Sequence, residues 1–132
     1  MLGFYKINRN FKDKKTGDCS IRALAGILGI SWQEALTLLY DSAMKTGYEP
    51  ADRRTMEKVL NEFGYEKMKQ PRKPDGKKYL VYELDEVLSD SEMHNGVVVN
   101  VANHYTIVRD GYIEDTWFCG YKSAGCYYAK KR

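Results

Sequence analysis

The stretch NHYTIVRDGYIEDTW, residues 103–117, predicts a β-hairpin whose turn is the Asp110-Gly111 pair. A two-residue type I′ turn needs positive φ at both positions, which Asp-Gly tolerates well. With the turn fixed there, three pairs face each other: Arg109 with Tyr112, Thr106 with Asp115, and His104 with Trp117. Because side chains alternate between the faces of a strand, His104 and Asp115 are expected on one face as diagonal neighbours. The same face carries Thr106, Val108, Ile113 and Trp117.

Short runs rich in β-branched and aromatic residues continue through the second half of the chain. We expect strands at residues 65–69, 78–82, 96–102, 104–109, 112–117 and 125–130, with a brief helix at 83–88.

The first half has helical periodicity instead, over residues 18–28, from 31 to about 44, and over 52–63. Gly29 and Gly64 are placed to end the first and third helices, and Ser31 with Glu34 has the spacing of a capping box. Helices followed by strands predict an α+β fold, with N-terminal helices packed on a mainly antiparallel sheet.

Length and composition are those of a single domain spanning residues 1–132. No apolar run, GVVV at 96–99 included, is long enough to cross a bilayer, and the N-terminus lacks an apolar signal segment. Three cysteines at irregular spacing are typical of free thiols in a reducing compartment. We therefore expect a cytoplasmic location and no membrane partner.

The net formal charge of +3 is unevenly distributed, with basic residues gathered at 6–22 and 67–78 and acidic residues at 83–92. Such runs are more often solvated faces than nucleic-acid sites. Nucleic-acid binding through the basic N-terminal segment is therefore the weakest of three functional hypotheses, and binding insensitive to salt would exclude it.

Cys19 lies at the start of the first expected helix, where unpaired N–H groups and the helix dipole stabilise a thiolate. An imidazole beside it completes an activated nucleophile, and a carboxylate behind the imidazole fixes its tautomer. His104 and Asp115 can fill these two roles, while the Cys19 backbone N–H can donate to an oxyanion. We expect the Cys19 sulfur to lie within about 4 Å of a ring nitrogen of His104.

GDCSIRAL at the helix start, followed later by NHYTIVRDGYIEDTW, resembles the papain-like cysteine peptidase fold. More closely, the chain is similar to small C39-peptidase-like proteins of bacteriophages and bacteria, from about Thr16 to Trp117. The resemblance implies that Cys19 is the nucleophile, His104 the base and Asp115 the orienting residue of a thiol hydrolase. Its substrate would be a peptide, isopeptide or other amide. If the chain is phage-encoded, the resemblance implies a host protein as substrate and the host cytoplasm as location.

The position at which papain-like enzymes carry an oxyanion-hole glutamine is Asp13 in this chain. Asn10, Lys14 or Thr16 could replace that donor. Asp18 is expected to cap the first helix.

Two further residues are expected to support the site. Arg22 could pair with Asp18 or Asp115, or reach an acidic substrate group, and Trp117 could shield the contact between His104 and Asp115 from water.

The missing glutamine favours a second hypothesis: a non-catalytic protein, such as a phage-encoded inhibitor of a host protein, that keeps the scaffold. Cys119 and Cys126, with His94 or His104, could ligate zinc, but their spacing is longer than that of a zinc knuckle. We therefore expect no metal and no cofactor, and we expect His94 to be a solvated loop residue.

Overall fold

Six strands form one mixed sheet in the computed structural model, which describes residues 1–131. The strand order is β1-β5-β4-β3-β6-β2. The strands are β1 (Gly3–Lys6), β2 (Tyr65–Met68), β3 (Val97–Val101), β4 (His104–Arg109), β5 (Tyr112–Asp115) and β6 (Tyr127–Lys130). The helices are α1 (Cys19–Leu28), α2 (Trp32–Thr46), α3 (Arg53–Glu62), α4 (Asp90–Asn95) and the 3₁₀-helix η1 (Val81–Glu86). The α+β class is confirmed, and every strand pair is antiparallel except β1 with β5.

The hairpin of β4 and β5 has the register that its turn predicts. Ile107 faces Glu114, Val108 faces Ile113, and Arg109 faces Tyr112. Asp110 and Gly111 have φ values of 51° and 83°, as a type I′ turn requires. The pairing of β4 with β5 ends before the expected pairs of Thr106 with Asp115 and of His104 with Trp117, and Trp117 lies beyond the end of β5.

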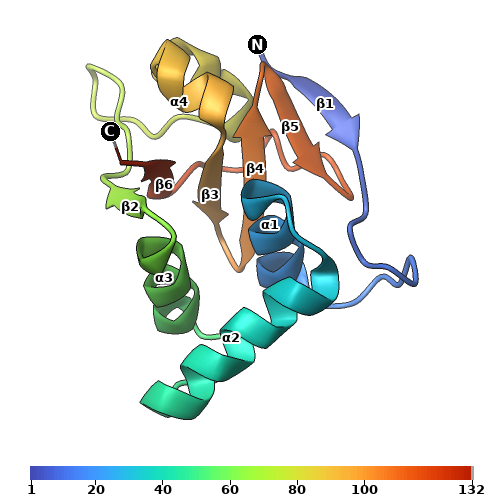
Figure 1. Ribbon diagram of the computed structural model, residues 1–132. Helices are drawn as coiled ribbons and strands as arrows, with labels where there is room; N and C mark the ends of the chain where they lie inside the picture. Colours follow the sequence, from blue (N-terminus) through green and yellow to red (C-terminus); the bar gives the residue numbers. More distant parts are fainter. Residues whose placement is uncertain (132) are drawn as a thin grey trace.

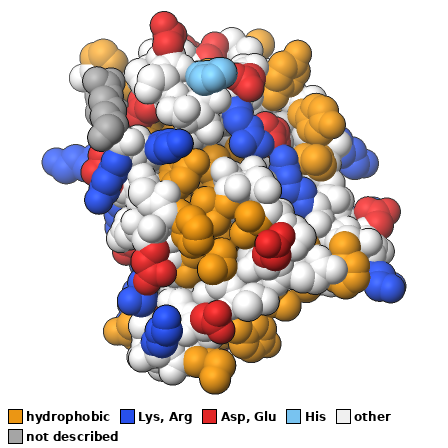
Figure 2. Space-filling view, viewed as in Figure 1, with side chains coloured by type: hydrophobic (Ala, Val, Ile, Leu, Met, Phe, Trp, Pro, Cys, Tyr) orange, Lys and Arg blue, Asp and Glu red, His pale blue; other side chains and the backbone are white. Residues whose placement is uncertain are grey.

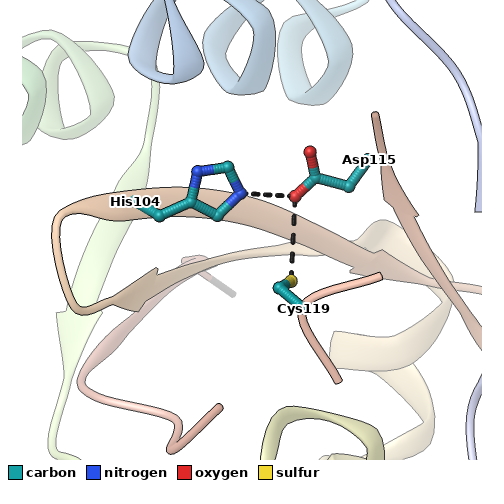
Figure 3. A group of neighbouring side chains, drawn as sticks. All are labelled: His104, Asp115 and Cys119. Atoms are coloured by element: carbon teal, nitrogen blue, oxygen red, sulfur yellow. Dashed lines mark hydrogen bonds and ion pairs between the residues drawn. The ribbon is translucent and has the colours of Figure 1, made fainter. Parts of the chain in front are cut away.

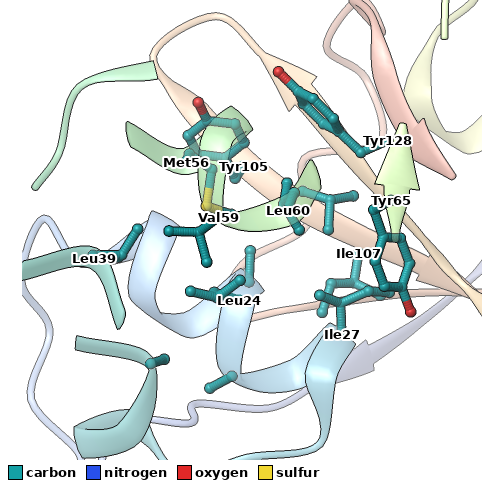
Figure 4. Packing of buried hydrophobic residues seen from close by; sticks show 14 residues of the cluster. Leu24, Ile27, Leu39, Met56, Val59, Leu60, Tyr65, Tyr105, Ile107 and Tyr128 are labelled. Carbon is teal, nitrogen blue, oxygen red and sulfur yellow. The ribbon is translucent and has the colours of Figure 1, made fainter. Parts of the chain in front are cut away.

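Helices α1, α2 and α3 lie on one face of the sheet (Figure 1). Their apolar stripes meet β3, β4 and β6 in a core that includes Leu24, Leu39, Met56, Leu60 and Ile107 (Figure 4). On this face of the molecule, exposed hydrophobic side chains gather near the centre, and charged side chains surround them (Figure 2). A second core on the opposite face contains Val81 and Leu84 of η1.

The helix ends follow local capping chemistry. The Ser31 hydroxyl accepts from the Glu34 N–H at 3.0 Å, and the Glu34 carboxylate accepts from the Ser31 N–H at 3.0 Å, which confirms the capping box. Gly29 is left-handed with φ 66° at the end of α1. Helix α2 continues to Thr46, slightly beyond its expected end.

Four elements differ from the sequence-based expectation. The expected strand at 78–82 is wrong, because Leu80 forms only an isolated bridge with Ser123 and the chain turns into η1 at Val81. The helix expected at 83–88 therefore begins and ends two residues earlier, as η1. Strand β1 and helix α4, which places His94 in its last turn, are not indicated by the periodicity that we used.

Within residues 1–131, no helix is by itself long and apolar enough to cross a membrane. Helices α1 and α2 meet that length and composition only when taken together, and they are bent by 111° relative to each other.

Candidate active site

The first residues of α1 and β4 meet at one end of the sheet. Helix α1 packs closely beside β4 because residue 26 is glycine: a Cβ at Gly26 would lie 2.5 Å from the Cδ1 atom of Ile107. Near the far end of the strand, Arg109 Nη1 donates to the Gly26 carbonyl at 3.3 Å. The two elements therefore run in the same direction, and Cys19 and His104, which begin them, line the same cleft.

His104 and Asp115 make the contact that the hairpin register predicts. The distance from Nε2 to Oδ2 is 2.6 Å (Figure 3), and the two side chains are only 10% and 2% exposed. Burial lowers the pKa of His104, but hydrogen bonds, first of all to Asp115, outweigh it and raise this pKa to about 11. Burial also opposes ionisation of Asp115, yet the hydrogen bond from His104 holds the pKa of this carboxyl below its ordinary value. At neutral pH the two groups are an imidazolium and a carboxylate.

The Cys19 thiol lies near the imidazole, which is one of the groups that lower the pKa of this thiol. Asp115 occupies Nε2, so Nδ1 is the ring nitrogen that remains for the thiol, and Figure 3 shows it pointing away from the carboxylate. Burial raises the pKa of the Cys19 thiol. Hydrogen bonds from His104 and the Tyr105 backbone N–H, with the charges of His104 and Arg22, lower that pKa by more, so its net value lies below that of an ordinary thiol. The arrangement favours a thiolate beside an imidazolium, which is the form that acts as a nucleophile.

Asp18 does not cap α1, contrary to the expectation. It is the N-cap residue, but its side chain accepts no hydrogen bond from the first turn. Its carboxylate instead accepts from Asn10 Nδ2 at 3.0 Å, Trp32 Nε1 at 2.8 Å and Arg22 Nε at 2.8 Å. Burial opposes ionisation, yet these donors hold the pKa of Asp18 below its ordinary value. Side-chain donors from three separate segments thus take the oxygens that a cap would have used.

Arg22 connects Asp18 to the carboxylate behind His104. Its Nη1 atom lies 3.4 Å from Asp115 Oδ1 and 3.0 Å from Thr116 Oγ1. Both pairings that the sequence left open for Arg22 are therefore present. The Thr116 N–H also donates to Asp115 Oδ1 at 2.7 Å. Asp115 is held by fixed donors on one oxygen and by His104 on the other.

The uncapped start of α1 leaves backbone donors beside the thiol. Among the described residues, the first backbone hydrogen bond at this end is from Arg22 N–H to the Asp18 carbonyl, at 2.9 Å. The N–H groups of Cys19 and Ser20 precede that bond and have no intrahelical partner. Both residues line the cleft. Two adjacent N–H groups at a helix start are suited to stabilise an oxyanion.

The other oxyanion candidates do not reach this cleft. Asn10 is 8% exposed; its Nδ2 donates to Asp18, and its Oδ1 accepts from the N–H groups of Lys12 and Lys14. Lys14 and Thr16 line a separate groove of about 800 Å³. Asn10 therefore supports the site through Asp18, and Lys14 supports it only by holding Asn10.

Trp117 lies against the imidazole of His104. The two ring centroids are 5.0 Å apart, with an angle of 45° between the ring planes, although Trp117 itself is 42% exposed. Trp117 also lines the 800 Å³ groove, together with Thr116. The indole therefore packs against the imidazole while remaining partly exposed.

The cleft beside Cys19 and His104 has a volume of about 590 Å³. The starts of α1 and α3, the turn between β3 and β4, and residues 123 and 125 form its walls. Sequence reasoning missed Ser20, Asn103, Tyr105 and Arg53, all of which line it. Ser20 and Asn103 adjoin Cys19 and His104 in the sequence, so proximity could have indicated them, whereas no spacing or motif links Arg53 to the site.

One group of side chains could hold a metal ion. The donor atoms of His104, Asp115 and Cys119 lie within 4.8 Å of one another (Figure 3). These donors already contact each other, since Cys119 Sγ is 3.7 Å from Asp115 Oδ2 and His104 is bonded to that same oxygen. The set is not the one considered from the sequence, because Cys126 contacts Asn100 and the exposed His94 lies near Asp110.

No family model matches the chain, and comparisons with curated proteins and with solved structures found no match either. We therefore infer function from the geometry of the site.

Proposed function

We propose that the protein is a thiol hydrolase that cleaves a peptide, isopeptide or other amide through an acyl-cysteine intermediate. The observation that supports this most strongly is the His104 imidazole, which bonds Asp115 at 2.6 Å and lowers the pKa of the Cys19 thiol. A papain-like relationship, and one to the small C39-like proteins of bacteriophages and bacteria, belongs to the same proposal, as do a cytoplasmic location and a host protein as substrate.

The proposed reaction begins when the Cys19 thiolate attacks the carbonyl carbon of the amide. The carbonyl π electrons move to oxygen, and the N–H groups of Cys19 and Ser20 stabilise the resulting oxyanion. The His104 imidazolium then donates its Nδ1 proton to the leaving nitrogen as the C–N bond breaks. Neutral His104 next takes a proton from water, the hydroxide attacks the acyl carbon, and the thiolate leaves. Asp115 keeps the ring oriented through both steps.

Capture of cleaved products tests this proposal. A protein mixture from a bacterial lysate is incubated with the wild-type chain or with the Cys19→Ser variant, and new N-termini are identified by mass spectrometry. We expect cleavage sites with the wild type that are absent with Cys19→Ser. Equal sets of N-termini with both proteins, together with an unreactive Cys19 in alkylation, would refute the hydrolase.

The second candidate is a non-catalytic binding protein, such as an inhibitor of a host protein. It is favoured by one observation, that Asp13 occupies the position of the expected oxyanion glutamine and its carboxylate accepts from Asn8 Nδ2 at 3.2 Å. The two candidates differ in the reactivity of Cys19, because a binding protein has no need of a thiolate.

A further inference from the structure

The cleft beside Cys19 is positively charged. Besides His104, two cations line it, Arg53 at the start of α3 and Lys78 from the loop before η1, and no aspartate or glutamate within residues 1–131 does. The charges of the Cys19 thiolate and the His104 imidazolium offset each other, and the remaining polar lining, which includes Gln70, Asn100 and Asn103, is uncharged. A cleft that is lined by charges of one sign concentrates the electrostatic field and attracts groups of the opposite charge.

These two cations are unpaired, unlike several of their neighbours. Within residues 1–131, the side chains of Arg53 and Lys78 make no hydrogen bond or ion pair. By contrast, the adjacent Arg54 bonds Asp52 at 2.8 Å, and Lys73 bonds Glu83 at 2.9 Å. Arg53 and Lys78 can therefore bind an incoming anion without first breaking an internal ion pair.

Tyr105, in the wall of the cleft, carries a buried donor that the protein leaves unused. Tyr105 lines the cleft and is 8% exposed, and its hydroxyl has no hydrogen-bond partner among the described residues. Burial raises the pKa of Tyr105 to about 12, so the hydroxyl keeps its proton at neutral pH. A buried hydroxyl without a partner costs free energy, and a ligand oxygen could recover it.

We infer that this cleft binds a peptide segment with acidic side chains next to the scissile amide, whose carboxylates pair with Arg53 and Lys78 and accept from the Tyr105 hydroxyl. The inference rests on the proposed function, since it names the substrate class of that same site. It would make the enzyme selective for acidic sequences, with a preference that weakens as salt screens the exposed cations.

Peptide binding to the full-length Cys19→Ala variant tests the inference without any turnover. The probes are fluorescein-labelled, C-terminally amidated glycine-rich hexapeptides that carry either two glutamates or two glutamines, followed by fluorescence anisotropy at low salt. We expect the glutamate peptide to bind about tenfold more tightly, because an exposed ion pair contributes up to about fivefold. Arg53→Gln and Lys78→Gln should each remove a part of this preference.

Arg54→Gln is the matched control, since Arg54 is on the same helix but is paired with Asp52 and does not line the cleft. Tyr105→Phe should weaken binding of the glutamate peptide. Equal binding of the two peptides, or a preference unchanged by both Arg53→Gln and Lys78→Gln, would overturn the inference.

A third probe with neutral side chains and a free C-terminal carboxylate should bind less well than the glutamate peptide, and the reverse order would overturn the assignment to acidic side chains. If the peptides show no acidic preference but Cys19 is reactive in alkylation, the acidic-substrate inference is wrong and the hydrolase proposal is unaffected.

Discussion

Replacing His104 with alanine should remove the cause of the low thiol pKa at Cys19. The imidazolium supplies both a hydrogen bond and a positive charge to the sulfur, while burial alone would raise the pKa of this thiol. In the variant, only the Tyr105 N–H and the Arg22 charge remain to oppose burial. The thiolate population at mildly acidic pH should therefore fall.

The size of this effect follows from the kind of contact that is lost. A hydrogen bond to a charged group contributes about 1.5–3 kcal/mol, which corresponds to about a ten- to hundredfold change in the thiolate population. For comparison, a thiol with an ordinary pKa of about 8.5 is only about 0.3% ionised at pH 6. Alkylation of Cys19 at pH 6 should thus be at least about tenfold slower in His104→Ala than in the wild type.

The assay is alkylation by iodoacetamide between pH 5 and 9, with mass spectrometry of the peptides that contain Cys19, Cys119 and Cys126. Asp115→Asn is a second variant that keeps the shape of the side chain and should also slow the reaction, because the raised pKa of His104 depends first on Asp115. His94→Ala is the matched control, since His94 is 84% exposed and lies on α4. An alkylation rate of Cys19 that is the same in wild type and His104→Ala at pH 6 would show that His104 does not lower the pKa of this thiol.

Three further predictions concern stability. Arg22→Met should destabilise the fold by about 3 kcal/mol in urea unfolding, because it leaves the buried Asp18 and Asp115 without their shared cation, and a loss below about 1 kcal/mol would contradict the buried network. Asp18 and Asp115 have pKa values lowered by folding, so their ionised forms stabilise the folded state above the unfolded pKa of 3.8, and this stabilisation is lost as pH falls through the folded pKa values. Tm measured from pH 6 to pH 2 should therefore drop steeply below about pH 4. The drop should be less steep in Asp18→Asn. Leu24→Ala, at a fully buried position, should cost about 2–5 kcal/mol, and a change within error would mean that α1 does not pack as described.

The hairpin could be predicted because its register depends on a local signal. Asp110-Gly111 fixes the turn, and strand alternation then brings His104 and Asp115 to one face without knowledge of any distant contact. The helix start at Cys19 was equally local, being set by the apolar spacing that follows it. The site could therefore be assembled from two short segments.

The elements that were not predicted depend on long-range pairing. Strand β1 is a short edge strand that is ordered by parallel pairing with β5, more than a hundred residues away in the chain, and its burial does not alternate. Asp18 was expected to cap α1, but the outcome depended on Asn10 and Trp32, which reach it from separate segments. Arg53 enters the cleft only because α3 packs beside the sheet, which periodicity does not reveal.

The protonation state of His104 decides whether an imidazolium stands beside the Cys19 thiol, and it can be followed by NMR because the chain has only two histidines. Two-dimensional NMR of protein with ¹⁵N-labelled histidine, with His94→Gln to assign the signals, distinguishes imidazolium from neutral imidazole at each pH. We expect His104 to stay an imidazolium through pH 8, since its pKa is raised to about 11. A neutral His104 ring at pH 7 would contradict the ion pair with the Cys19 thiolate on which the proposed hydrolase depends.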